Sequence, residues 1–317
     1  MAKATSNPAL LRKLSTFVGE ASSSTFEKGR FHECCVRASL AKAFALATEA
    51  HASRKTRISF FLAPSLRSIC EDLIVLGYMA KIDHAARDEL SMILITHELR
   101  RRSAIQGAFF QKVRPDQPIL RVKDESIEQL EAQARSIWQK NGWPKLRNGL
   151  MPNVRQIAEK HHFDLLTTVY DYLYRLTSGM VHFNPQVLLR TGWGPNPVDV
   201  TFSPKNFESY YQSFARTYGL MLLCLYFELF DEILKPDRKA NDAVRSIRAN
   251  LIKESRWPEM VTYEEMNRKP PTGQEVLRLL VRIQSAQQYE NGFLTRKDDN
   301  AEQGIQPDDP ASGGSAG

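Results

Sequence analysis

Apolar residues recur at helical spacing along most of this 317-residue chain. The segment before Asn184-Pro185 shows the pattern well. Its apolar residues fall three or four positions apart, at Leu165, Leu166, Val169, Leu173, Leu176 and Met180. Residues at this spacing lie on one face of an α-helix. Since the sequence has neither strand-like alternation nor an internal repeat, it predicts an all-α, multi-helix bundle with long helices.

Capping residues and prolines predict where these helices begin and end. Asn7-Pro8 is expected to begin the first helix, and Ser24 to Glu27 matches a capping box for a long alanine-rich helix. Later helices are predicted to begin at Pro64, Asp83, Asp124, Asn153 and Asp164. Asn141-Gly142 and Asn184-Pro185 are expected to end two of them, because glycine favours a left-handed cap and proline cannot donate into a helix.

The last third of the chain shows a loop, three helices and a tail. Residues 183 to 204 are predicted to be irregular, and an aromatic stripe from Phe207 to Leu229 predicts a buried helix. Two further amphipathic helices are expected at Asn241–Ser255 and Thr272–Gln288. The expected division is 1–55 (N-terminal helices), 56–235 (helical core), 236–292 (C-terminal helices) and 293–317 (disordered tail).

The composition is that of a folded globular protein. Hydrophobic residues make up 42% and charged residues 25% of the chain. The longest apolar run, Gly219 to Phe227, is far shorter than the roughly 20 residues that cross a bilayer. Residues 1–7 are not an apolar signal core, so a cytoplasmic protein without a membrane partner is expected. The four cysteines show no C-x-x-C pair, which indicates reduced thiols.

The chain has a net charge of +7, and the acidic tail from Thr295 lowers it from +10 for the rest. Basic residues cluster at Arg54–Arg57, Arg100–Arg102, Arg121–Lys123 and Arg238–Arg256. These clusters are expected to be solvated helix faces, with a surface that binds a polyanion as the alternative.

Several enzyme classes are excluded by missing motifs. The sequence has no P-loop, no dinucleotide-binding glycine fingerprint, no H-E-x-x-H and no G-x-S-x-G. The pairs His97-Glu98 and His161-His162 have no partners at metal-ligand spacing. Neither a metal nor a cofactor is therefore expected.

Three polar residues share one stripe of the helix that precedes Asn184. Arg175, Ser178 and His182 lie within about 60° of one another on a helical wheel. Arginine supplies a permanent planar charge that suits a phosphate, and histidine can exchange a proton near neutral pH. Metal-independent RNA cleavage needs at least one group that moves a proton and one that stabilises charge on the phosphoryl group, and this pair supplies both. Gly179 lowers helix propensity, which predicts a close approach by another helix or a ligand.

Arg67 and Glu71 are four residues apart on an earlier helix. They are expected to form an ion pair that fixes helix packing, with a place in a shared pocket beside Arg175 and His182 as the alternative.

The segment from Tyr174 to His182 resembles two signatures. Arg175, six intervening residues and His182 resemble the R-x(4–6)-H signature of the HEPN superfamily. These all-helical proteins include metal-independent ribonucleases of toxin–antitoxin, abortive-infection and CRISPR systems. The spacing of Tyr174, Ser178 and His182 more closely resembles a bacterial helical domain family of unknown function, which we place near HEPN.

A second segment, Arg67 to Glu71, is similar to an Arg-x-x-x-Glu segment of that family. Together the similarities cover residues Thr56 to Phe230. One position departs from the HEPN pattern: Leu176 follows the arginine, where many active HEPN nucleases have Asn, Asp or His.

The resemblance implies a metal-independent endoribonuclease of an antiphage-defence or toxin system. In it, His182 is the acid/base, Arg175 stabilises the transition state and Ser178 orients the histidine. The residues expected to support this pocket are Arg67, Glu71, Tyr174 and Asn184. The partners implied are RNA, a second copy in a homo-oligomer and a protein encoded nearby. Two alternatives stay open: a noncatalytic helical interaction module, and a basic nucleic-acid-binding protein of a stress or defence system.

Overall fold

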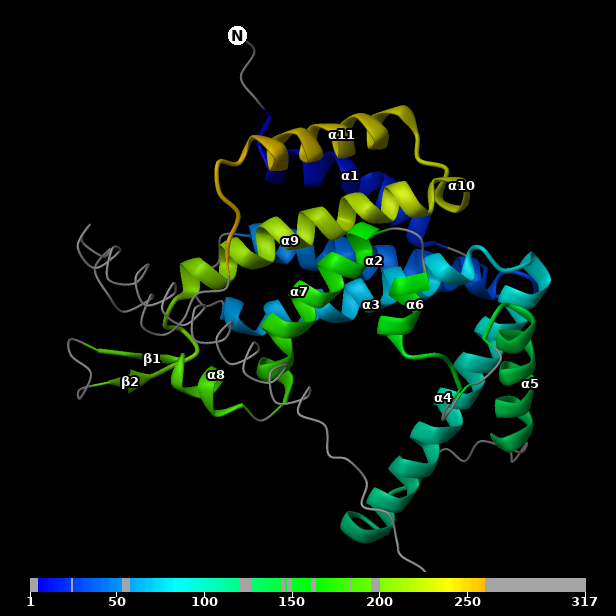
Figure 1. Cartoon of the computed structure of the whole chain (residues 1–317). Helices are drawn as coiled ribbons and strands as arrows, with labels where there is room; N and C mark the ends of the chain where they lie inside the picture. Colours follow the sequence, from blue (N-terminus) through cyan, green and yellow to red (C-terminus); the bar gives the residue numbers. More distant parts are fainter. Residues whose placement is uncertain are drawn as a thin grey trace, which may run out of the picture. The chain divides into compact units, whose positions relative to one another are not determined.

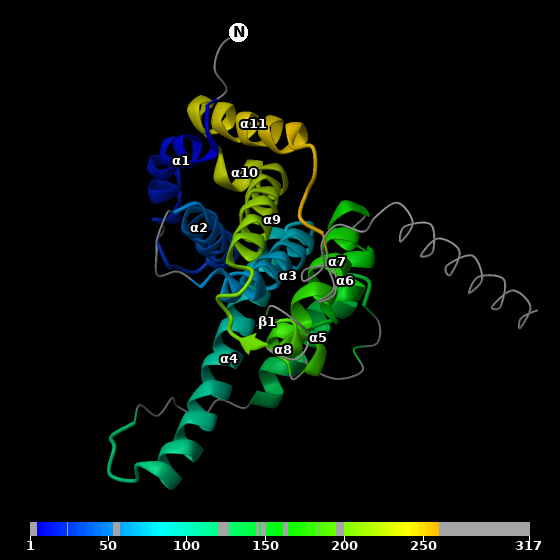
Figure 2. The same cartoon turned by 90° about the vertical axis from the view of Figure 1, so that its left-hand side faces the viewer.

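Helices make up nearly all of the regular structure (Figures 1 and 2). The computed structural model describes residues 5–23, 25–52, 58–119, 127–143, 146, 150–160, 164–182, 184–194 and 200–259. Within these ranges it contains eleven α-helices, one short 3-10 helix and one two-stranded ladder, which confirms the all-α fold. The predicted helix Thr272–Gln288, the tail from residue 293 and the cap at Asp124 lie outside the described ranges.

The elements follow one another along the chain in a simple order. The first half contains α1 (Asn7–Ser22), α2 (Phe31–His51), η1 (Ser59–Phe61), α3 (Ala63–Met79), α4 (His84–Val113) and α5 (Ile127–Lys140). The second half contains α6 (Val154–Lys160), α7 (Asp164–Val181), α8 (Pro185–Leu189), β1 (Gly192–Trp193), β2 (Thr201–Phe202), α9 (Glu208–Leu229), α10 (Asp231–Leu234) and α11 (Arg238–Lys253). All of these elements belong to one compact unit. The domain boundaries expected from the sequence remain predictions.

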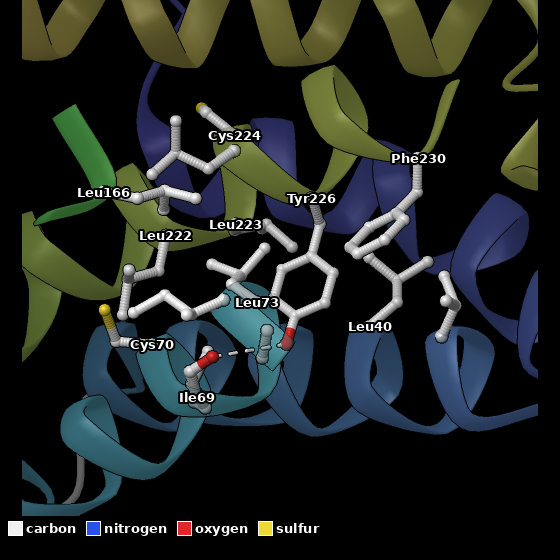
Figure 3. Close-up of a cluster of buried hydrophobic side chains, with 14 of the residues drawn as sticks. Leu40, Ile69, Cys70, Leu73, Leu166, Leu222, Leu223, Cys224, Tyr226 and Phe230 are labelled. Atoms are coloured by element: carbon white, nitrogen blue, oxygen red, sulfur yellow. Dashed lines mark hydrogen bonds between the residues drawn. The ribbon is translucent and has the colours of Figure 1, made fainter. Parts of the chain in front are cut away.

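Helix α9 is the centre of the bundle because its side chains are apolar almost all round. It packs against α2, α3 and α11, while α1 covers both α2 and α11. Figure 3 shows Tyr226 of α9 reaching between α2 and α3, where its hydroxyl donates to the carbonyl oxygen of Ile69 at 3.4 Å. The same hydroxyl is hydrogen-bonded to Ser39. A large ring is thus buried without an unsatisfied polar group.

The four cysteines are free thiols. Cys70 and Cys224 are buried in this core (Figure 3), and burial raises the pKa of the Cys224 thiol to about 12. No helix in the described part of the chain is long and apolar enough to cross a lipid bilayer.

Several helix ends lie where local signals predict them. Pro64 is in the first turn of α3, and the Asp83 carboxylate accepts from the backbone N–H groups of Ala85 and Ala86 at the start of α4. Asn153 caps α6 by accepting from the N–H of Arg155 at 2.9 Å. Gly142 follows α5 with a φ of +88°, as a C-terminal glycine should.

Two helix starts differ from the sequence expectation by a few residues. In α1, Asn7 is the first helical residue and Ser6 precedes it. Helix α11 begins at Arg238 rather than Asn241, because the Asp237 carboxylate accepts from the N–H of Ala240 at 2.7 Å.

The start of α2 was predicted wrongly. The helix begins at Phe31, not directly after the capping box at Ser24 to Glu27. A carboxylate from α4 replaces the local cap: Asp88 accepts from the N–H of Gly29 at 2.8 Å and from that of His32 at 3.1 Å. Tertiary contact therefore sets this helix start.

The prediction that residues 183 to 204 are irregular was also wrong in part. Helix α8 lies in this segment, and β1 pairs antiparallel with β2, with Gly192 opposite Phe202. Asn184 caps α8, since its side-chain oxygen accepts from the N–H of Val187 at 3.4 Å. Helix α7 ends at Val181, before the Asn184-Pro185 pair that was expected to end it.

Candidate functional site

Helix α7 separates a buried face from an exposed one. Leu166, Leu173 and Leu176 point into the core, and α7 packs against α3 and α6. Arg175 and His182 are exposed on the other side, and Ser178 is half-buried. The predicted stripe is therefore on the solvent side of the helix, where a large substrate can reach it.

A pocket of about 630 Å³ lies beside this stripe. Residues of α3, α6, α7 and the segment before α6 line it: Arg67, Glu71, Met151, Pro152, Asn153, Val154, Arg155, Tyr170, Asp171, Tyr174 and Arg175. The structure thus brings together four of the predicted site residues, Arg67, Glu71, Tyr174 and Arg175. Ser178, His182 and Asn184 do not line it.

Arg67 is held by two partners, one on its own helix and one on α7. Its Nε donates to Glu71 Oε1 at 2.8 Å. Its guanidinium carbon lies 4.3 Å from the centre of the Tyr174 ring, a cation–π contact. Burial lowers the pKa of Arg67, but the hydrogen bond and the charge of Glu71 outweigh burial, so the net pKa is raised. Arg67 and Glu71 therefore both form the ion pair and line the pocket.

Tyr170 lies behind Tyr174, with the two ring centres 5.5 Å apart. Burial, followed by the charge of Glu71, raises the pKa of Tyr170 to about 12. Its hydroxyl therefore stays protonated and remains a hydrogen-bond donor.

His182 lies at the end of the stripe, outside the pocket. It follows Arg175 by seven positions, which is about 10 Å along a helix. Its backbone N–H donates to the carbonyl oxygen of Ser178 at 2.9 Å, which continues the helical ladder past Val181. The imidazole is exposed, and no hydrogen bond to it is present among the residues that the structure describes. It is thus free to meet a ligand.

Gly179 lets the turn after α7 fold back onto the helix. A Cβ at this position would be 2.7 Å from Val187 Cγ2 and 2.8 Å from Asn184 Nδ2. The close approach predicted from the sequence is therefore made by α8 and by the residue that precedes it. Asn184 contributes to the site indirectly, through the shape of this turn.

Sequence reasoning missed two charged residues of the pocket. Asp171 precedes Arg175 by four positions and lies on the same stripe, so helical spacing alone could have indicated it. Arg155 comes from α6, where its Nε is 3.1 Å from Glu159 Oε1. No sequence signal connects Arg155 with α7, because only the packing of α6 brings the two together.

Two of the three arginines that line the pocket are in ion pairs, and the third is available to a ligand. Arg67 pairs with Glu71 and Arg155 pairs with Glu159. No ion pair or hydrogen bond involves the Arg175 side chain within the described ranges. The described part of the chain also holds no group of three His, Cys, Asp or Glu side chains that could bind a metal ion. The site can thus offer a fixed positive charge and a proton carrier.

Comparison with known protein families identifies one matching segment. Residues 62–195 match DUF5677, a family of unknown function. The DUF5677 segment begins just before α3 and ends just after β1, so it contains the pocket and the whole stripe of α7. A domain of unknown function is therefore present over these residues, while the match gives no assignment to HEPN. Searches of the curated proteins and of the solved structures gave no significant match.

Proposed function

We propose that this protein is a metal-independent endoribonuclease of an antiphage-defence or toxin system. One observation supports the proposal above all: Arg175 and His182 share the exposed side of α7, and neither side chain has a partner among the described residues. A structural histidine would be buried or hydrogen-bonded. This pair instead faces solvent, where an RNA backbone can lie along the helix.

In the proposed reaction, His182 accepts the proton of a ribose 2′-hydroxyl, and the 2′-oxygen attacks the adjacent phosphorus. The bond from phosphorus to the 5′-oxygen breaks, and the leaving oxygen takes a proton from water. The imidazolium then gives its proton to the hydroxide that remains. Arg175 stabilises the charge that develops on the phosphoryl oxygens, and Ser178 orients the imidazole or the phosphate. The products are a 2′,3′-cyclic phosphate and a 5′-hydroxyl.

The remaining site residues position the pair. Arg67, held by Glu71, packs on Tyr174 and so fixes α7 against α3. Asn184 begins the turn that packs against Gly179, next to Ser178. The proposed partners are RNA, a second copy of the chain and a protein encoded nearby.

The test is RNA cleavage by the full chain in EDTA. We expect His182→Ala and Arg175→Ala each to reduce the cleavage rate by about 100-fold or more. Because both side chains are exposed, the melting temperature should not change. His84→Ala is the matched control, since His84 is also exposed but lies at the start of α4. Unchanged cleavage by His182→Ala would overturn the catalytic assignment.

A noncatalytic interaction module is the second candidate function. It is favoured by apolar side chains exposed near the end of α7 and on the elements that follow: Val181, Leu188, Leu189, Trp193 and Phe202. In this case the wild-type protein cleaves no RNA, and changes at Leu188 or Leu189 abolish binding of a partner. Binding of RNA without cleavage, weakening steeply with salt, would instead favour the basic nucleic-acid-binding alternative.

A further inference from the structure

The second half of α4 lies outside the bundle. Figures 1 and 2 show this helix extending past α5 and the other described helices. No residue from Leu99 to Val113 is buried by the described part of the chain. Four apolar side chains in this half are each more than half exposed: Leu99, Ile105, Phe109 and Val113. An exposed apolar row of this kind indicates an interaction surface.

Three of these exposed residues, Leu99, Phe109 and Val113, belong to a heptad pattern. Steps of three and four residues alternate along one face of α4, through Met92, Ile95, Leu99, Arg102, Gln106, Phe109 and Val113. This is the a/d spacing of a coiled coil, with five apolar positions out of seven. We call these seven residues the α4 seam. It faces away from α5, which contacts the other side of α4 through His97, 3.4 Å from Glu131.

Just before the α4 seam begins, the same face of α4 packs against α2. Asp88, seven residues before Ile95 and so on the same face, accepts hydrogen bonds from the start of α2. Helix α2 and α4 pack together there. Past Ile95, no described element takes over from α2. The α4 seam therefore continues the face on which α2 packs, into a part of α4 where no described helix covers it.

We propose that a second copy of this chain supplies the missing helix, with the two α4 helices antiparallel. In the register centred near Ala104, Leu99 packs against the partner subunit's Phe109, and Ile95 against the partner subunit's Val113. Arg102 then meets the partner subunit's Gln106, so the polar positions of the seam face each other. Arg102 has five N–H donors and uses one on Glu98 at 2.7 Å, which leaves others for the glutamine carbonyl.

Charge selects the antiparallel arrangement over the parallel one. A parallel pair in register would place Arg102 against the partner subunit's Arg102, a like-charge contact at a core position. In the antiparallel register the flanking positions also match. Glu98 lies near the partner subunit's Lys112, and Ile105 near the partner subunit's Ile105. The seam is thus complementary to itself, as a two-fold interface requires.

The first test is the oligomeric state of the full chain by sedimentation velocity at micromolar concentration. We expect the wild type to be a dimer and the double variant Leu99→Glu, Phe109→Glu to be a monomer of unchanged helicity. Ala108→Glu is the matched control, because Ala108 is exposed on the opposite side of α4, and it should stay dimeric. A monomeric wild type, or a double variant that stays dimeric, would overturn the proposal.

The second test determines the register by cysteine cross-linking under mild oxidation. We expect a mixture of Leu99→Cys and Phe109→Cys chains to form a disulfide-linked dimer readily. Leu99→Cys alone should cross-link no more than the wild type, which already carries four free cysteines. Efficient cross-linking of Leu99→Cys to itself would show a parallel pair and overturn the antiparallel register. Neither test depends on the ribonuclease proposal.

Discussion

At the scale of single residues, Gly179 is a position beside the site where one added carbon would clash with its neighbours. We expect Gly179→Ala to lower the melting temperature, because Val187 and Asn184 lie under 3 Å from the new Cβ. Overpacking costs about 1–3 kcal/mol, which exceeds the gain of about 1 kcal/mol in helix propensity. Thermal unfolding of the full chain measures the change.

Gly19 supplies the control for this substitution. It lies in α1, is exposed, and a Cβ added there would have no atom within 4 Å. Gly19→Ala should therefore stabilise the protein by about 1 kcal/mol through helix propensity alone. If both alanine variants were equally stabilised, the close packing of α8 on α7 would be wrong.

His32 makes stability depend on pH. Its imidazole Nε2 donates to the carbonyl oxygen of Leu76 at 3.1 Å, and burial lowers its pKa to about 4. As the pH falls below 6.5, the unfolded chain binds a proton at His32 and the folded chain does not. The contribution of neutral His32 to the free energy of unfolding is thus fully present above pH 6.5, and it is lost as the pH falls toward 4. At pH 5 the expected loss is about 2 kcal/mol.

Urea unfolding of the wild type and of His32→Gln at pH 7 and pH 5 measures this contribution. Glutamine can keep a hydrogen bond to Leu76 but does not titrate. The loss between the two pH values should therefore be smaller in His32→Gln. An identical loss in both proteins would show that other groups cause it.

At the scale of helices, Arg67 joins α3 to α7. We expect Arg67→Lys to cost about 1 kcal/mol in the free energy of unfolding, because lysine keeps the charge but loses the planar stack on Tyr174. Arg155→Lys is the control, since the Arg155 pair with Glu159 is largely exposed and should change stability by less than about 0.5 kcal/mol. Equal effects in urea unfolding would contradict the role of Arg67.

Three helix starts were predictable from local signals. Asp83 and Asn153 accept from N–H groups within three residues, and Pro64 fits the first turn through its fixed φ, so the sequence alone places α3, α4 and α6. The start of α2 was not predictable, because its cap is Asp88, which is 56 residues from His32. The same holds for α8, whose packing depends on Gly179 and Asn184 meeting in space.

In the candidate site, too, one part was predictable from local sequence and another part depends on tertiary packing. The stripe of Arg175, Ser178 and His182 follows from helical periodicity, and their partial or full exposure agrees with the apolar face opposite. The pocket beside them does not follow from any single helix. It needs Arg155 from α6 and Arg67 from α3, and their approach to α7 is a result of packing.

At the scale of the whole molecule, one core extends from α1 to α11. Leu14 of α1 is fully buried, and Asn250 of α11 donates to the carbonyl oxygen of Thr5 and to the side chain of Asn7. We expect Leu14→Ala to cost about 2–5 kcal/mol and to lower a single unfolding transition. Differential scanning calorimetry measures this. Two transitions, with only one shifted by the substitution, would show that the first helices unfold separately.

The most direct measurement of the central claim is the chemistry of the RNA ends. Wild-type protein in EDTA should produce fragments with 2′,3′-cyclic phosphate and 5′-hydroxyl ends. The same RNA incubated with His182→Ala should stay intact. Fragments with 5′-phosphate ends, or cleavage only when a divalent metal is present, would contradict the proposed roles of Arg175 and His182.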